Sequence, residues 1–244
     1  MSILKIKNLT KRFGGLMVLD GCSLDIQKGN ITAIIGPNGS GKTTLFDCIS
    51  NLLPIDKGSI LFKDNDTSKI EDFEVAKRGV SRTFQEVRLF KNLNIKDHLE
   101  IALNEHDEHL IKSIFGKREN MDERIKEILD LIGLNKDWKT YANNLSYGQR
   151  KLLDLAMRIA KKHDVLMLDE PVAGINPKLR GDIKRILIEL RKKGETIIVI
   201  EHDMNFVMGI ADKIYVLDYG KVIAQGKPED IQNNKKVFEA YLGE

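Results

Sequence analysis

The stretch Gly36-Pro37-Asn38-Gly39-Ser40-Gly41-Lys42-Thr43-Thr44 decides how the rest of the sequence is interpreted. It follows the apolar run 31–35 and precedes residues 45–50, whose apolar spacing is typical of a helix. The loop between this strand and this helix fits the pattern G-x-x-x-x-G-K-S/T at each fixed position. Its glycines let backbone N–H groups line a hollow, and the start of the helix adds further unpaired N–H groups. We therefore predict a polyphosphate site; the alternative is a glycine turn with a chance lysine.

Side chains of the same loop indicate a nucleoside triphosphate. The ammonium group of Lys42 can reach the β- and γ-phosphates, and the hydroxyl of Thr43 can bind Mg²⁺. The loop residues expected to contact the nucleotide are Asn38, Gly39, Ser40, Gly41, Lys42, Thr43 and Thr44.

Length and composition indicate an ordinary globular protein. The 244 residues can bury a sizeable core, and 42% of them are hydrophobic and 31% charged. The net charge of +3 is the small difference between 39 basic and 36 acidic residues, so it neither favours nor excludes a nucleic-acid partner. Cys22 and Cys48 lack metal-type spacing and are expected to be reduced core thiols. No apolar run approaches the roughly 20 residues that span a bilayer, so any membrane part would come from a partner.

Hydrophobic patterns predict an α/β fold with three parts. Before and after the loop, short alternating segments indicate an antiparallel β subdomain, with strands at 3–8, 23–26 and 59–62 and a turn at 11–15. From about 86 to 162 the patterns are helical, which predicts a helical subdomain inserted into a single domain spanning 1–244. Later apolar runs are typical of strands buried in a parallel sheet, and a hairpin follows them, so the central sheet is expected to be mixed. These segments are 165–168, 195–200 and the hairpin 213–224.

Three histidines, His98, His106 and His109, lie among acidic residues in the helical region. They could suggest a metal site. However, no pair at i, i+4 spacing is joined by a carboxylate in ligand geometry, which favours a solvated, charged surface.

Charged residues follow two of the buried strands, where a parallel sheet presents its functional groups beside a phosphate loop. Asp169 can hold the shell of a Mg²⁺ ion, and Glu170 can polarise an attacking water. The alternative is that these acids only cap the next helix. After the second strand, His202 can contact the γ-phosphate and the attacking water, although taken alone it could be an ordinary surface histidine.

A second anion-binding helix start is predicted at Ser146-Tyr147-Gly148-Gln149. Ser146 is a natural N-cap, and Gly148 leaves the N–H groups of the first turn uncovered. Two phosphate-binding ends separated by a helical subdomain are explained by a head-to-tail dimer, in which each nucleotide lies between the glycine-rich loop of one copy and the Ser146 helix of the other. A plain capped helix is the alternative.

The ordered set of motifs resembles the ATP-binding subunit of an ATP-binding cassette (ABC) transporter over essentially the whole chain. The set comprises the phosphate loop, Gln85, residues 145–149 as the signature motif, residues 165–170 as the Walker B strand, and His202. The resemblance implies a P-loop NTPase fold of the ABC ATPase type, with a RecA-like α/β core, and it implies ATP and Mg²⁺ as cofactors.

The resemblance also implies a role for each site residue. Phe13 would stack on adenine, with Val18 in the same ATP site, and Gln85 would sense Mg²⁺ and the transmembrane partner. The signature residues Ser146 and Gly148, with Gln149, would bind the ATP of the opposite subunit. Glu170 would activate water and His202 would act as the switch residue, so the expected catalytic set is Lys42, Gln85, Glu170 and His202. The expected Mg²⁺ ligands are Thr43, Gln85 and Asp169.

Three residues depart from the commonest family pattern. Phe13 replaces a tyrosine but keeps a stacking face. Tyr147 stands where glycine is usual, and Asn176 replaces an aspartate that contacts the opposing subunit. The last change affects the contact between subunits, although asparagine still forms hydrogen bonds.

Segments 82–85, 173–177, 201–204 and 240–244 resemble those of the ATPases of branched-chain amino acid importers. Lipopolysaccharide-export ATPases, with a similar C-terminal tail, are one alternative, and a soluble ABC ATPase acting on nucleic acid or ribosomes is another. The resemblance implies a homodimer or heterodimer, integral membrane permease subunits, an indirect link to a substrate-binding protein, and no nucleic-acid partner. It also implies a cytoplasmic protein, peripheral on the inner face of the cell membrane.

Overall fold

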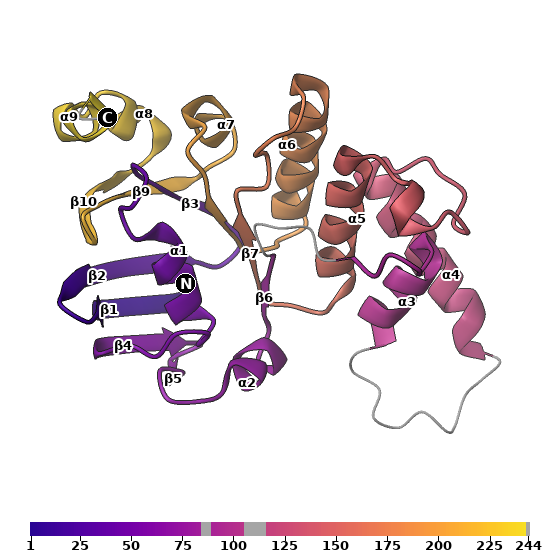
Figure 1. The fold of residues 1–244 in the computed structure, drawn as a ribbon, viewed down its shortest axis with the longest axis horizontal. Coiled ribbons are helices and arrows are strands. Elements are labelled where there is room, and N and C mark those ends of the chain that lie inside the picture. The colour runs from indigo at the N-terminus through magenta and orange to yellow at the C-terminus, as the bar shows by residue number, and fades with distance from the viewer. Residues whose placement is uncertain (84–88, 105–115, 243–244) are drawn as a thin grey trace.

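The structure is a computed structural model that describes residues 1–83, 89–104 and 116–242. Its central sheet contains β3 (Ile31–Ile35), β6 (Val80–Arg82), β7 (Val165–Asp169), β8 (Ile197–Ile200), β9 (Lys213–Asp218) and β10 (Lys221–Gly226). A second sheet contains β1 (Ser2–Phe13), β2 (Leu16–Gln27), β4 (Lys57–Phe62) and β5 (Asn65–Asp66). The strand orders are β10-β9-β3-β8-β7-β6 and β2-β1-β4-β5 (Figure 1).

The central sheet is mixed, as predicted. β3 pairs in parallel with β8 on one side and β9 on the other, and β7 pairs in parallel with β8 and β6. The hairpin of β9 and β10 adds the antiparallel edge. Every residue of β3, β7 and β8 is buried, which explains their continuous apolar sequences.

The second sheet is antiparallel, also as predicted, but its first two strands are longer than expected. β1 runs through Lys11 to Phe13, so the turn between β1 and β2 contains Gly14 and Gly15 alone. At this end of β1 the charged side chain of Lys11 has a main-chain partner: its Nζ donates to the carbonyl of Pro54 at 2.6 Å. Lys11 is thereby buried despite its charge.

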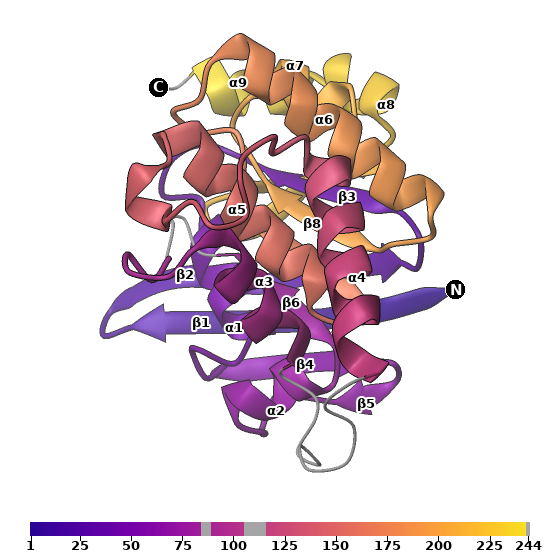
Figure 2. The same ribbon diagram turned by 90° about the vertical axis from the view of Figure 1, so that its right-hand side faces the viewer.

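Nine α-helices occur within the described residues: α1 (Lys42–Ile49), α2 (Asp72–Lys77), α3 (Ile95–Asn104), α4 (Gly116–Ile132), α5 (Tyr147–Ala160), α6 (Pro177–Lys192), α7 (Met204–Met208), α8 (Pro228–Gln232) and α9 (Lys235–Leu242). Side chains of β7 divide between two cores. Leu166 and Leu168 pack with α3 to α6, and Val165 and Met167 pack with α1 and the antiparallel sheet. In Figure 2 the helices α3 to α6 lie in front of the strands.

The helical character expected at about 86–162 is present in α3, α4 and α5. These helices share one core with α6 and the central sheet rather than enclosing one of their own. Their division from the rest of the chain as a subdomain stays a prediction. In the described ranges, no helix has the length and apolar character needed to cross a membrane.

The two sheets are joined by the buried side chain of Tyr215 on β9. Its hydroxyl accepts from the N–H of Asp25 at 2.9 Å and donates to the carbonyl of Asp25 at 2.9 Å. Lys213 Nζ lies 2.6 Å from the same oxygen. This tyrosine thus ties β2 to the central sheet, and the N–H of Asp20 on β2 adds a second link by donating to the carbonyl of Gly220 at 3.0 Å.

One sequence-based interpretation is wrong. His98, expected on a solvated surface, is fully buried on α3. Its Nε2 accepts from the N–H of Phe90 at 3.0 Å, and its Nδ1 lies 2.8 Å from the carbonyl of Asn94. Local main-chain groups therefore satisfy both ring nitrogens. His106 and His109 lie outside the described residues.

Candidate active site

The predicted site residues come from strands that end at the same edge of the central sheet. Ile34 of β3 pairs with Ile200 of β8, and Ile200 pairs with Asp169 of β7. Met167 of β7 pairs with Arg82 of β6. The phosphate loop after β3, the acids at the end of β7 and the histidine after β8 are therefore brought side by side.

The glycines of the phosphate loop are required by the backbone. Gly39 and Gly41 have φ values of +77° and +100°. A Cβ atom on Gly36 would lie 2.0 Å from the carbonyl oxygen of Leu217, so the loop is packed tightly against β9. The loop therefore needs glycine for two reasons: Gly39 and Gly41 adopt positive φ values, and Gly36 allows the backbone of β9 to come close.

The polar groups of the loop suit an anionic ligand. Lys42 Nζ donates to the carbonyls of Gly36 at 2.7 Å and Pro37 at 2.8 Å, which holds the ammonium group over the loop. The buried hydroxyl of Ser40 has no hydrogen-bond partner among the residues that the structure describes. Asn38 is exposed. A buried hydroxyl without a partner beside a held cation fits a loop that binds phosphate.

The exposed residues of α1 and the β1–β2 hairpin complete this side of the site. Thr43 is exposed and Thr44 partly exposed at the start of α1. A Cβ atom on Gly41 would lie 2.8 Å from the carbonyl of Val18, so β2 touches the loop. Phe13 has 46% of its surface exposed and can offer a ring face to a ligand.

Asp169 is buried and held by Arg82, a residue that the sequence analysis did not assign to the site. Arg82 Nη2 lies 3.4 Å from Asp169 Oδ2, and Arg82 Nη1 lies 2.6 Å from Asp47 Oδ1 on α1. Burial raises the pKa of the Asp169 carboxyl, and the guanidinium group opposes that shift. Arg82 thus links the acid at the end of β7 to the helix that follows the phosphate loop.

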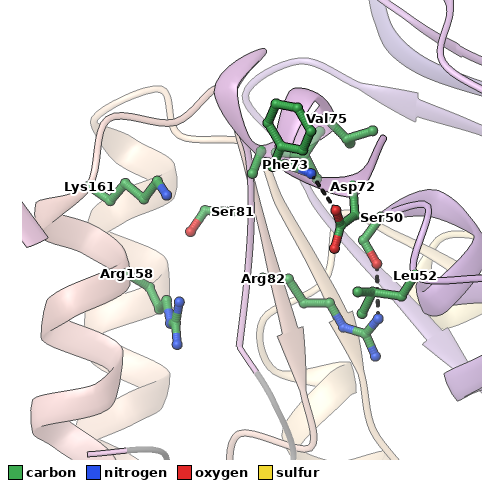
Figure 3. Close-up of a pocket in the computed structure, with 11 residues that line it drawn as sticks. Ser50, Leu52, Asp72, Phe73, Val75, Ser81, Arg82, Arg158 and Lys161 are labelled. Carbon is green, nitrogen blue, oxygen red and sulfur yellow. Dashed lines mark hydrogen bonds between the residues drawn. The ribbon is translucent and has the colours of Figure 1, made fainter. Parts of the chain in front are cut away.

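Figure 3 shows the cavity that Arg82 lines together with Ser81, Arg158 and Lys161. It has a volume of about 180 Å³ and lies beside β6. In Figure 3, Arg82 reaches Ser50 through the hydrogen bond of 3.0 Å to its hydroxyl. β6 ends at Arg82, and Gln85 lies outside the described residues.

Glu170 and His202 face each other across the ends of β7 and β8. Glu170 has φ +47°, and its N–H donates to the carbonyl of Ile200 at 3.0 Å. Glu170 Oε1 lies 3.6 Å from His202 Nδ1, and the side chains are 20% and 57% exposed. A carboxylate held in this way, next to an exposed imidazole, can accept a proton from a bound water.

Glu201 contacts the main chain on either side of the Glu170–His202 pair. The sequence analysis did not assign it a role. Its side chain is fully buried. It accepts from the N–H of Val172 at 3.0 Å and from the N–H of His202 at 3.2 Å. Burial raises the pKa of Glu201, while these N–H donors oppose the shift. Glu201 therefore joins the loop after Glu170 to the segment that carries His202.

The signature residues open into a different cavity. Ser146 caps α5: its hydroxyl accepts from the N–H of Gln149 at 3.3 Å, and its own N–H donates to Gln149 Oε1 at 3.0 Å. Asn176 caps α6 by accepting from the N–H of Leu179 at 2.9 Å. Both helix starts line one cavity of about 600 Å³. The phosphate-loop residues 37–40 line a separate cavity of about 250 Å³ that shares no residue with it.

Comparison with known proteins identifies the family. The sequence profile described as ABC transporter matches residues 19–173, which include the phosphate loop, the signature motif and both acids. The chain belongs to the ABC transporter ATP-binding family. The profile of the branched-chain amino acid ATP-binding cassette transporter matches residues 221–244 of this ABC ATPase.

Full-length relatives and solved structures agree with this assignment. The probable branched-chain amino acid transport protein LivG of Archaeoglobus fulgidus is 39% identical, with 100% of this chain and 96% of the relative covered. LivG of Escherichia coli is 38% identical, with 99% and 98% covered. The cassette MJ1267 in its ADP conformation has a TM-score of 0.86 at 35% identity over 100% of both chains. A dimeric post-hydrolysis state of the cassette MJ0796, bound to ADP and Pi, has a TM-score of 0.79 at 26% identity, with 92% and 98% covered. The predicted ABC ATPase fold and resemblance are confirmed, and the alternatives are not favoured.

Proposed function

We propose that this ABC ATPase hydrolyses ATP at composite sites between two head-to-tail subunits, and thereby drives a membrane permease that imports branched-chain amino acids. The observation that supports the composite site is the separation of two anion-binding regions. One lies at the phosphate loop and the other at the starts of α5 and α6, in cavities with no residue in common. In the proposed dimer each subunit would therefore supply one half-site to each of two nucleotides.

In the proposed site the chain's own residues bind the nucleotide. The N–H groups of residues 38–44 and the ammonium group of Lys42 surround the phosphates, and Phe13 stacks on adenine beside Val18. The residues proposed to hold Mg²⁺ are Thr43, Gln85 and Asp169, whose oxygen atoms are the ligands that this ion prefers. The buried, Arg82-held carboxylate of Asp169 fits that role. Bound Mg²⁺ would neutralise charge on the phosphates during transfer.

Hydrolysis needs a base beside the attacking water. We assign this role to Glu170, whose N–H donates to the carbonyl of Ile200 on β8 and whose carboxylate lies 3.6 Å from His202 Nδ1. His202 would contact the γ-phosphate and orient the same water from the next strand. Glu170 then accepts the water proton as the water oxygen bonds to the γ-phosphorus. The bond from that phosphorus to the β,γ-bridging oxygen breaks, and ADP and inorganic phosphate are released.

Closure of the site would come from the second subunit. Ser146 of the partner subunit, with its Gly148 and Gln149, would bind the γ-phosphate through the start of α5. A Cβ atom on Gly148 would lie 2.6 Å from Leu179 Cδ2, so this glycine lets the starts of α5 and α6 pack closely at the proposed contact. The dimeric MJ0796 relative supports assembly in pairs, and the sequence is compatible with a homodimer or a heterodimer.

The transport role rests on the relatives. LivG and BraF proteins are named for branched-chain amino acid transport, and they match this chain over nearly its full length. By that likeness the chain would lie on the cytoplasmic face of the membrane, against permease subunits that receive amino acids from a substrate-binding protein. Gln85 and the helices expected at about 86–162, as a subdomain, would carry the signal to the permease. The exposed Phe73 lines the cavity of Figure 3 together with Arg158, near the end of α5.

The substitution Glu170→Gln tests the proposed mechanism. Glutamine keeps the size and the main-chain bonds but cannot accept a proton, so we expect ATP binding to persist and turnover to fall about 10²- to 10⁴-fold. ATP should then hold the variant as a dimer, measured by size-exclusion chromatography with light scattering. Glu189→Gln, on the outer face of α6, is the matched control and should turn over normally. Normal hydrolysis by Glu170→Gln would exclude Glu170 as the base.

A further inference from the structure

Lys151, on the second turn of α5, makes unusual contacts for a lysine. Its side chain is buried, and its Nζ donates to the carbonyls of Ala173 at 2.8 Å and Glu170 at 3.2 Å, with that of Pro171 at 3.5 Å. All of these acceptors belong to one segment, residues 170–174, which we call the Glu170 loop. An ammonium group has three donors, and here all three point at the main chain of this loop.

The Glu170 loop needs such support because its first residue is strained. A φ of +47° is costly for a residue with a side chain, by about 1–2 kcal/mol. The N–H of Glu170 is held by Ile200 and the N–H of Val172 by Glu201. Lys151 holds carbonyl groups of the same loop, those of Glu170, Pro171 and Ala173. Without it, the carbonyl of Glu170 loses its charged donor and the loop can relax toward an ordinary backbone conformation.

A second contact joins α5 to the same loop one turn earlier. A Cβ atom on Gly174 would lie 3.8 Å from Cε1 of Tyr147, so the tyrosine ring lies against the loop. Lys151 Nζ is 5.8 Å from the centre of that ring, within the range of a cation–π contact. Tyr147, where the family usually has glycine, therefore packs on the Glu170 loop while its neighbours Ser146 and Gly148 remain at the cavity.

We propose that Lys151 is a positioning residue for hydrolysis: it fixes the Glu170 loop, and with it the carboxylate that faces His202. Burial lowers the pKa of Lys151 and the nearby carboxylates of Glu201 and Glu170 oppose that shift. Because α5 begins at the residues proposed to bind the ATP of the opposite subunit, Lys151 also connects that nucleotide to the base of its own subunit. This inference rests on the proposed function of Glu170.

The test compares Lys151→Met and Lys151→Arg with Lys162→Met, an exposed lysine just beyond α5 that serves as the matched control. Steady-state ATP hydrolysis gives kcat and KM for each purified variant. We expect Lys151→Met to lower kcat about tenfold to hundredfold with little change in KM, since the phosphate loop is untouched. Lys151→Arg keeps the charge and donors and should recover part of kcat. Lys162→Met should match the unmodified protein.

A double-variant cycle shows whether Lys151 acts through Glu170. If it does, the slow residual hydrolysis of Glu170→Gln should not fall further when Lys151→Met is added, because the base is already absent. Equal falls in both backgrounds would overturn the proposal, as would an unchanged kcat in Lys151→Met. If Lys151→Met does not fold, judged by its thermal transition, Lys151→Gln, which removes the charge but keeps a polar side chain, replaces it in the same cycle. Normal turnover by Glu170→Gln would instead refute the proposed function, independently of Lys151.

Discussion

Replacing Gly36 and Gly39 separately by alanine tests how the phosphate loop is built. At Gly39 the φ of +77° is the main obstacle, because a Cβ atom there meets nothing within 4 Å. At Gly36 the added Cβ would lie 2.0 Å from the main-chain oxygen of Leu217 and 2.8 Å from the hydroxyl oxygen of Ser40. Both substitutions add one methyl group to the same loop, but the one at Gly39 strains the backbone conformation and the one at Gly36 also clashes with neighbouring atoms.

The expected magnitudes follow from these environments. A left-handed backbone conformation destabilises the folded state by about 1–2 kcal/mol when the residue has a side chain. Alanine also restricts the unfolded chain more than glycine does, which stabilises the folded state by about 0.4–1 kcal/mol. Gly39→Ala should therefore lower the free energy of unfolding by about 1 kcal/mol. Gly36→Ala must also displace the backbone of β9, which adds about 1–3 kcal/mol. We expect a difference of about 2 kcal/mol between the variants.

Thermal unfolding followed by circular dichroism, without nucleotide, measures this difference. For a chain of this length about 1 kcal/mol corresponds to about 2–4 °C, so Gly36→Ala should melt about 4–8 °C below Gly39→Ala. Urea titration gives the same comparison at one temperature. Equal losses in the two variants would refute the reasoning, because they would mean that the contact with Leu217 does not require glycine at this position.

Two further predictions concern buried polar groups. Lys42→Met should weaken ATP binding strongly, measured by fluorescence of a labelled nucleotide, since the ammonium group held by Gly36 and Pro37 is lost; unchanged affinity would contradict a phosphate site at this loop. Burial raises the pKa of Cys22 to about 12 and that of Cys48 to about 11, so both thiols stay protonated at pH 8. We expect a thiol reagent to label the folded protein at least about 100-fold more slowly than the protein in urea, and equal rates would disprove their burial.

Features that depend on consecutive residues could be predicted from the sequence. The phosphate loop, the buried strand that ends at Asp169 and the cap at Ser146 are each defined by a short run of residue types. The edge at which Asp169, Glu170 and His202 meet also follows, because parallel strands end together. Cys22 and Cys48 are buried and unpaired, as expected.

Features that depend on distant contacts could not be predicted in this way. Arg82 meets Asp47 and Asp169, which lie 35 and 87 positions away in the chain. Glu201 accepts a hydrogen bond from the N–H of Val172, and no local sequence pattern indicates that the two residues are in contact. Lys151 did leave a signal, because it is a charged residue on the buried face of α5. A lysine in such a position needs a polar partner, and in the structure that partner is the main chain of the Glu170 loop.

Tyr215 has a consequence for the thermodynamics of ligand binding. Its hydroxyl ties Asp25 of β2 to β9, and β9 in turn lies against Gly36. Phe13 pairs with Leu16, two residues before Val18, and Val18 lies against Gly41 of the phosphate loop. Phe13 and the phosphate loop therefore belong to one preassembled surface. When only a small fraction of a protein has the conformation that binds a ligand, the measured affinity falls by that fraction. A nucleotide that binds both Phe13 and the loop does not incur this loss, because the two sheets already have the required arrangement.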